Sequence, residues 1–283
     1  MSEEKWAIIT GADGGMGTEI TRAVAEAGYH IIMACYRPSK VEPIRQRLVN
    51  ETGNVNLEVM AVDLSSMAST ASFADRIVER HLPVSLLMNN AGTMETGLHI
   101  TDDGFERTVS VNYLGPYLLT RKLLPVLTRG ARIVNMVSCT YAIGHLDFPD
   151  FFRQGRKGRF WRIPVYSNTK LALMLFTIEL SERLREKGIT VNAADPGIVS
   201  TDIITMHQWF DPLTDIFFRP FIRTPKKGAS TAVGLLLDEA VAGVSGQLYA
   251  GNRRKELSDN YIYHVQKEQL WEITEQLLAQ WFT

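Results

Sequence analysis

The chain of 283 residues is poor in cysteine, carries almost no net charge and has no long apolar run. Its two cysteines, Cys35 and Cys139, lie in apolar stretches, which excludes a disulfide-rich secreted fold and favours a reducing compartment. Thirty basic against 31 acidic residues give a net charge of −1, whereas nucleic-acid-binding proteins usually carry a strong basic excess. Neither a signal-peptide pattern nor an apolar span of about 18 residues is visible. We therefore expect a cytoplasmic protein with no transmembrane segment and no nucleic-acid partner.

Short apolar runs alternate with amphipathic segments of helix length along the chain. The runs are continuous, which is typical of strands in a parallel sheet that helices cover on both faces. With 45% hydrophobic residues, the chain can bury one large core. These features predict an α/β fold: a single Rossmann-like, doubly wound domain over residues 1–283, with a seven-stranded parallel sheet flanked by helices. The expected strands are residues 6–10, 29–35, 57–62, 84–89, 131–137, 189–194 and 246–250, and the expected helices include 17–27, 66–80, 105–128, 167–187 and a terminal helix at 258–282.

Two connections are longer than this alternation requires, and long connections in a compact domain usually carry function. Residues 198–227 are rich in aromatic residues and prolines. Residues 140–164 combine aromatic and basic side chains, which could contact a membrane surface or an anionic group, or form a solvated loop. The side chains in question are Phe151, Phe152, Arg153, Arg156, Lys157, Arg159, Phe160, Trp161 and Arg162.

The first expected strand leads into a glycine-rich turn, "ITGADGGMG", which opens a helix. Gly11, Gly15 and Gly17 stand at the spacing G-x-x-x-G-x-G. Glycine permits a tight turn and lets the backbone approach a pyrophosphate, while the helix N-terminus offers free N–H groups and a favourable dipole. In this strand–turn–helix context the motif predicts a dinucleotide-binding site.

From about residue 5 to 250, six motifs in the same order resemble the short-chain dehydrogenase/reductase family. The long separation between Ser138 and Tyr166, with "RIVNMVS" and "SNTKLALMLFTIEL", resembles its retinol dehydrogenase-like branch. The resemblance implies an NAD(P)-dependent oxidoreductase that interconverts an alcohol and a carbonyl by hydride transfer, on a small and apolar substrate. The six motifs are the glycine turn, "NNAG" at 89–92, "VNYLG" at 111–115, Ser138, "YSNTK" at 166–170 and "DPGIVST" at 195–201.

Tyr166 and Lys170 are one helical turn apart, so their side chains lie on one face of the expected helix. A tyrosine with its ordinary pKa near 10 is a poor base at neutral pH. A lysine ammonium nearby favours the phenolate, so we expect the pKa of Tyr166 to be lowered into the range of a general acid–base catalyst. The pair therefore predicts the proton-transfer half of an active site.

The resemblance completes the catalytic set with Ser138 and Asn112. Ser138 ends a strand at the sheet edge where ligands of open α/β sheets bind, and its hydroxyl can orient the substrate oxygen beside Tyr166. Asn112 is implied to hold a water that links Lys170 to solvent as a proton relay. The six histidines show no spacing typical of metal ligands, and we expect no metal site.

The choice of cofactor depends on the end of the second strand, "IIMACYRPSK". NAD sites usually place an acidic residue there to accept hydrogen bonds from the ribose, but Cys35 stands at that position. Arg37 and Lys40 follow closely and could hold a 2′-phosphate. These residues favour NADP (NADPH), with NAD as the alternative.

The resemblance implies a wider set of cofactor contacts. Asp63 would contact adenine, although it could equally cap the following helix, and Thr201 would meet the nicotinamide carboxamide. The full set of expected cofactor-binding residues is Gly11, Asp13, Gly14, Gly15, Met16, Gly17, Tyr36, Arg37, Lys40, Asp63, Leu64, Asn89, Ala91, Gly92, Tyr166, Lys170, Pro196, Gly197, Val199 and Thr201.

The resemblance also places a substrate loop within residues 198–227 and implies a homodimer or homotetramer built on helices 105–128 and 167–187. The aromatic residues that could cover an apolar substrate, or simply pack in a core, are Trp209, Phe210, Phe217, Phe218 and Phe221. Two other functions stay open at this point: a non-catalytic dinucleotide-binding protein and a peripheral membrane protein.

Overall fold

A computed structural model describes residues 4–148, 150–153, 160–197 and 223–282. Its centre is one sheet of eight strands in the order β3-β2-β1-β4-β5-β6-β7-β8, in which the first seven are parallel. The α/β class and the doubly wound arrangement that we predicted are therefore confirmed. The strands are β1 (Trp6–Thr10), β2 (His30–Cys35), β3 (Leu57–Ala61), β4 (Val84–Asn89), β5 (Leu127–Met136), β6 (Thr190–Asp195), β7 (Leu248–Ala250) and β8 (Arg253–Lys255).

The eighth strand was not predicted. β8 follows a tight turn at Gly251 and Asn252, both with positive φ, and pairs antiparallel with β7. All three of its residues are exposed and basic, so the strand lacks the apolar pattern by which the other seven were identified. The predicted seven-stranded sheet is thus extended by one short antiparallel edge strand, and a strand of this kind with charged side chains is a common way of ending a sheet.

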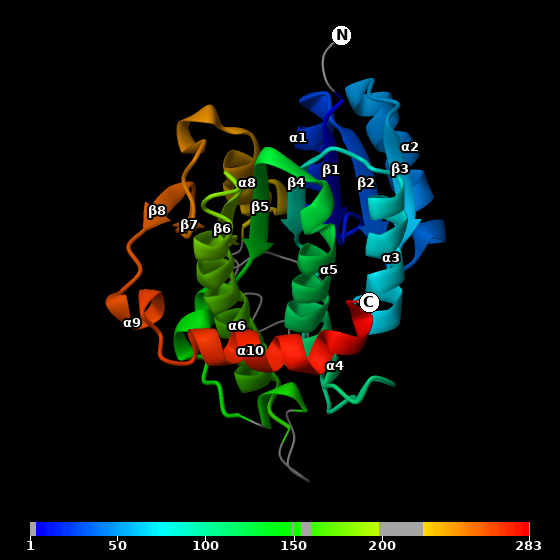
Figure 1. Ribbon diagram of the computed structural model, residues 1–283. Coiled ribbons are helices and arrows are strands. Elements are labelled where there is room, and N and C mark those ends of the chain that lie inside the picture. The colour runs from blue at the N-terminus through cyan, green and yellow to red at the C-terminus, as the bar shows by residue number, and fades with distance from the viewer. Residues whose placement is uncertain (1–3, 149, 154–159, 198–222, 283) are drawn as a thin grey trace, which may run out of the picture.

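Helices cover both faces of the sheet (Figure 1), and the sheet divides the hydrophobic core into two layers. Side chains of alternating direction along β1 enter different layers: Ile8 packs in one, and Ala7 and Ile9 pack in the other. One layer is covered by α1 (Gly15–Glu26), α2 (Pro38–Thr52) and α8 (Pro225–Leu237), and the other by α3 (Met67–Glu79), α5 (Gly115–Leu123) and α6 (Arg162–Arg183).

The segment that we predicted as one helix over 105–128 is helical from Arg107 to Val126, but it is divided among three helix types. It consists of α4 (Arg107–Val109), a π-helical turn (Ser110–Leu114), α5 and a 3-10 turn (Leu124–Val126), after which β5 begins. Pro116 has no N–H to donate to the carbonyl four residues earlier, and Pro125 lies in the 3-10 turn where α5 has ended. The prediction of a helix here is thus confirmed over most of its range, and the two prolines lie where the helix type changes.

The predicted terminal helix over 258–282 is also divided, into α9 (Asp259–Ile262), α10 (Lys267–Leu278) and a final 3-10 turn. α10 crosses α5 and α6 (Figure 1). Trp271 lies 5.1 Å from the ring of Tyr117 and 5.9 Å from that of Phe176, measured between ring centroids. Thr274 and Tyr113 share a hydrogen bond of 2.9 Å. The chain's own helix α10 thus occupies part of the surface on which we expected oligomer contacts.

The basic and aromatic connection over 140–164 differs from the expected surface loop. Phe151 and Phe152 are buried, and the Phe151 ring lies 5.8 Å from that of Tyr113 in the core. Trp161 is 69% exposed, while Arg156, Lys157 and Arg159 lie outside the described residues. In the described part of the chain, no helix is long and apolar enough to cross a membrane.

The packing of α10 can be tested with two neighbouring leucines. Leu278 is fully buried in the core, whereas Leu277 is 37% exposed. We expect Leu278→Ala to lower the free energy of unfolding by about 2–5 kcal/mol, because it leaves a cavity in the core. Leu277→Ala should cost less than about 1 kcal/mol. Chemical denaturation of both variants measures the difference, and equal losses would contradict the described packing.

Candidate active site

The glycine turn after β1 is fixed by contacts too close for any side chain. Gly11 has φ +62°, and a Cβ atom there would lie 2.9 Å from Cα of Ala91. A Cβ on Gly17 would lie 1.9 Å from the Gly11 carbonyl oxygen. The Asn90 amide nitrogen donates to the carbonyl oxygens of Thr10 (3.0 Å) and Gly11 (3.1 Å), which joins the turn to the segment after β4. These contacts leave no room for a side chain at Gly11 or Gly17.

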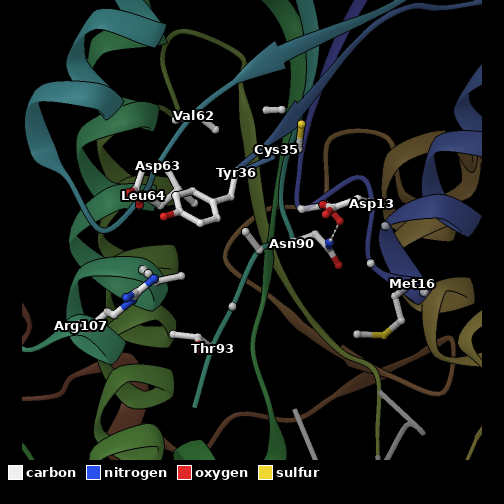
Figure 2. Close-up of a pocket in the computed structure, with 18 of the residues that line it drawn as sticks. Asp13, Met16, Cys35, Tyr36, Val62, Asp63, Leu64, Asn90, Thr93 and Arg107 are labelled. Carbon is white, nitrogen blue, oxygen red and sulfur yellow. Dashed lines mark hydrogen bonds between the residues drawn. The ribbon is translucent and has the colours of Figure 1, made fainter. Parts of the chain in front are cut away.

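A pocket of about 610 Å³ opens against this turn (Figure 2). It lies at the carboxyl ends of β1, β2, β3 and β4, where ligands of open α/β sheets bind. Of the expected cofactor-binding residues, eleven line it: Gly11, Asp13, Gly14, Gly15, Met16, Gly17, Tyr36, Asp63, Leu64, Ala91 and Gly92. The other lining residues, which the sequence analysis missed, are Ala34, Cys35, Val62, Asn90, Thr93, Glu95, Arg107 and Val111.

Among the described residues, seven expected cofactor contacts do not line the pocket, and three of them lie at or just after the ends of β2 and β4. Arg37 and Lys40 are exposed outside it, and the Arg37 guanidinium lies 5.5 Å from the centroid of the Tyr36 ring. Asn89 is buried below the pocket, where its amide nitrogen donates to Thr120 Oγ1 (3.0 Å) and Asn135 Oδ1 (2.8 Å). Its neighbour Asn90 lines the pocket instead. Because "NNAG" contains two adjacent asparagines, the sequence could not show which asparagine points into the core.

Other expected contacts lie farther along the sheet edge. Pro196 and Gly197 follow β6, outside the lining of this pocket. The Asp195 carboxylate accepts a hydrogen bond of 2.9 Å from the Gly197 N–H. Val199, Thr201 and the five loop aromatics lie outside the described residues, as does most of the expected substrate loop.

Asp63 does not cap the next helix, because Ser66 is the N-cap of α3 and its hydroxyl accepts from Ser69 N. Asp63 Oδ1 instead accepts hydrogen bonds from the backbone N–H (2.8 Å) and the hydroxyl (2.6 Å) of Ser65. Asp63 also lines the pocket, so the adenine contact that the resemblance implies stays a prediction.

The structure brings Ser138, Tyr166 and Lys170 together at the end of β5 and the start of α6. Lys170 is buried, its ammonium donates to the Met136 carbonyl (2.9 Å), and it lies 5.3 Å from the centroid of the Tyr166 ring. The Ser138 side chain is hydrogen-bonded to Tyr166. A Cβ atom placed on Gly92 would lie 3.8 Å from Lys170 Nζ, so this cluster adjoins the pocket.

The pKa of Tyr166 is shifted in the direction opposite to our expectation. Burial raises it to about 12, the hydrogen bond with Ser138 lowers it less, and the Asp195 carboxylate raises it further. Burial also lowers the pKa of Lys170 to about 8, against the opposing effect of Asp195. The expectation of a lowered pKa for Tyr166 is therefore wrong for the protein alone, because burial has the largest effect. At neutral pH the phenol is protonated.

Asn112 lies on the π-helical turn and is fully buried. Its amide oxygen accepts from Thr93 N (2.8 Å), and its nitrogen donates to Thr93 O (2.8 Å) and Thr169 Oγ1 (3.2 Å). The side chain thus ties the segment after β4 to the helix that carries Tyr166. A π-helical turn of this kind is frequent at functional sites. The proton-relay function of Asn112 stays a prediction.

The steric requirement at the glycine turn can be tested with Gly17 in α1 and Gly14, the N-cap residue before it. In Gly17→Ala the new methyl group would meet the Gly11 carbonyl at 1.9 Å, whereas in Gly14→Ala it would lie at an ordinary 3.5 Å. We expect Gly17→Ala to lower the free energy of unfolding by about 1–3 kcal/mol or more, because the turn must shift. Gly14→Ala should change it far less. Urea unfolding of the two variants gives the comparison, and a neutral Gly17→Ala would contradict the close approach.

Comparison with known proteins places these residues in a family. A family model described as short chain dehydrogenase matches residues 5–149 and 153–209. Retinol dehydrogenase 13 of Homo sapiens is 36% identical over 258 residues, which cover 89% of this chain and 77% of that protein. Retinol dehydrogenase 12 of Mus musculus is 35% identical over 280 residues, which cover 98% of this chain and 87% of that protein.

A solved structure supports the same assignment. The crystal structure of a variant of actinorhodin polyketide ketoreductase with NADPH superimposes with a TM-score of 0.68 and 26% identity, over 87% of this chain and 95% of that chain. The chain therefore belongs to the short chain dehydrogenase family and is similar to its retinol dehydrogenases.

Proposed function

We propose that this protein is an NAD(P)-dependent oxidoreductase that interconverts an alcohol and a carbonyl compound. The observation that carries the proposal is the position of Tyr166, Lys170 and Ser138 next to a pocket that begins at a glycine-rich turn. A non-catalytic nucleotide-binding protein would have no need of a buried lysine beside a tyrosine at the end of its pocket. For a peripheral membrane function, the burial of Phe151 and Phe152 removes part of the expected contact surface.

The residues that line the pocket support binding of a dinucleotide. The glycine turn lines it at the N-terminus of α1, where backbone N–H groups and the helix dipole favour a pyrophosphate. Asp63 would hold the adenine end, and Gly92 would lie on the nicotinamide side beside Lys170. When bound, the nicotinamide supplies or accepts the hydride.

NADP is the cofactor that the residues favour. The end of β2 carries Cys35 and Tyr36 and no carboxylate to bind a free ribose. The ketoreductase with NADPH, described above, has the same fold. Arg37 and Lys40 stay the proposed phosphate contacts, and they would have to move toward the ligand because they lie outside the pocket.

The protein's own part in the reaction is to orient the substrate oxygen and to move one proton. The Ser138 hydroxyl would orient the oxygen toward the Tyr166 hydroxyl. With its pKa raised to about 12, Tyr166 holds its proton at neutral pH and can donate it to a carbonyl oxygen. In the reductive direction, this proton on the carbonyl oxygen and a hydride supplied to the carbonyl carbon together give the alcohol. Loss of the proton leaves a phenolate, which the adjacent Lys170 ammonium would stabilise. The buried protonated phenol thus favours carbonyl reduction as the first activity to assay.

The substrate is proposed to be apolar. Two relatives that match nearly the full chain are named retinol dehydrogenases, and retinol is a long apolar alcohol. An assay with retinal and a series of apolar aldehydes therefore tests the proposal first.

We expect Tyr166→Phe to lower turnover by at least about 100-fold, since a positioned general acid contributes about that much. Cofactor affinity should stay nearly unchanged, because the phenol meets the substrate rather than the glycine turn. Steady-state rates of aldehyde reduction and cofactor fluorescence measure the two quantities. Tyr263→Phe is the control, since Tyr263 is 75% exposed outside the site. Full activity of Tyr166→Phe would refute the mechanism.

We expect purified protein to bind NADPH more tightly than NADH, because no carboxylate at the end of β2 would repel a 2′-phosphate. Nicotinamide fluorescence during titration with each nucleotide measures the preference. Tighter binding of NADH would instead mean that Tyr36 and its neighbours accept a free ribose, and binding of neither would refute the dinucleotide site.

A further inference from the structure

Arg107 is the one lysine or arginine among the described residues that line the pocket. It lies on α4, four residues before Val111, which lines the same wall. Arg107 belongs to none of the sequence motifs, so its place in the pocket could not be expected from the sequence. Its position in the pocket calls for an explanation in terms of the ligand, because the cations that were expected to meet the nucleotide lie outside.

The side chain of Arg107 is held in place through one nitrogen, which leaves its other two nitrogens available to a ligand. Its Nε lies 3.5 Å from Glu95 Oε1, and the same carboxylate oxygen accepts a hydrogen bond of 3.1 Å from the Thr93 hydroxyl. The Arg107 backbone N–H donates to the His99 carbonyl at 2.8 Å. Within the described residues, neither terminal nitrogen of the guanidinium has a hydrogen-bond partner, and the side chain is 42% exposed. A flat, partly exposed group therefore faces the pocket from a fixed base.

Tyr36 contributes a second flat group to the same pocket. Figure 2 shows its ring reaching from the end of β2 toward Leu64, with Asp63 beside it and Arg107 on the α4 side. The ring is 54% exposed although it lines a pocket, so a ligand could cover a large apolar area there. The Tyr36 ring and the Arg107 guanidinium thus border the same end of the pocket. The Asp63 carboxylate lies at this end too and can accept a hydrogen bond from a ligand.

The charges at this end of the pocket indicate which part of a nucleotide fits. Asp63 and Glu95 bring two carboxylates near the single guanidinium of Arg107. A phosphate dianion would meet this acidic excess unfavourably. A neutral base with an exocyclic amine would instead find a hydrogen-bond acceptor in Asp63 and a planar cation in Arg107.

We propose that Arg107 is an adenine-recognition residue, whose guanidinium packs on the base in the space between α4 and Tyr36, and that Glu95 is its positioning residue. This inference rests on the proposed dinucleotide site and names a specificity residue within it. A lysine at this position would keep the charge and lose the flat face, so the two properties can be separated.

The test is calorimetric titration of the full chain with three fragments of the cofactor: 5′-AMP, 2′,5′-ADP and nicotinamide mononucleotide. For Arg107→Leu and for Arg107→Lys we expect both adenine nucleotides to bind about tenfold more weakly, because both changes remove the flat guanidinium face that packs on the base. Binding of nicotinamide mononucleotide should not change. Glu95→Gln, which keeps Arg107, should weaken both adenine nucleotides by a smaller factor. Arg253→Leu, in the exposed strand β8, is the matched control and should bind like the wild type.

The outcomes separate this inference from the function on which it rests. If the wild type binds none of the fragments and no NADPH, the dinucleotide site itself is wrong. If the wild type binds them and Arg107→Leu binds equally well, the site stands and Arg107 has no such function. Selective loss of 2′,5′-ADP, or full binding by Arg107→Lys, would show that Arg107 acts through its charge, and the adenine assignment would be wrong. Circular dichroism of each variant identifies a folding failure, in which case Arg107→Lys and Glu95→Gln still decide the question.

Discussion

The close approach of two chain segments at the middle of the sheet is the constraint on which the rest of the site depends. The strand order reverses between β1 and β4, and this reversal leaves a crevice at their carboxyl ends. Gly11 lies almost in contact with Ala91, and Asn90 donates to the carbonyl of Gly11. Thr10 completes the junction, since its hydroxyl oxygen accepts from the backbone N–H groups of Asn90 (3.0 Å) and Ala91 (3.1 Å). The pocket is therefore a consequence of how two strand ends meet.

The same junction determines where the chemistry can take place. The segment after β4 continues through Gly92 to Thr93, where Asn112 holds both backbone groups. Asn112 also contacts Thr169 on α6, one residue before Lys170. A chain of direct contacts thus runs from the glycine turn to the acid–base pair, and each member of it is either buried or packed against backbone. Burial then raises the pKa of Tyr166 and lowers that of Lys170, so it favours the uncharged form of each side chain. Proximity of the two groups alone would not have had this effect.

Much of this arrangement could be predicted from the sequence. The seven parallel strands were found because each is a continuous apolar run, and the acid–base pair was found because helical spacing aligns Tyr166 with Lys170. The π-helical turn before Pro116 was missed because the apolar period continues across it. The sequence also could not show that Asn89 faces the core and Asn90 the pocket, since adjacent strand residues point to opposite faces and the strand end was uncertain by one position. Arg107 reaches the pocket only through tertiary structure.

Helix α10 links distant parts of the chain in a way that bears on the order of folding. Its Thr274 bonds to Tyr113 across 161 residues of sequence, and its Trp271 packs against Tyr117 and Phe176. These rings belong to the same layer of the core as the helix that carries the acid–base pair. During synthesis, α5 and α6 are complete long before α10 exists, so their outer aromatic faces stay open until the last element arrives. Contacts of such long sequence separation form late and slowly. The emerging chain would therefore expose an aromatic surface for a chaperone to bind, and this side of the core would be complete only when α10 has packed against α5 and α6.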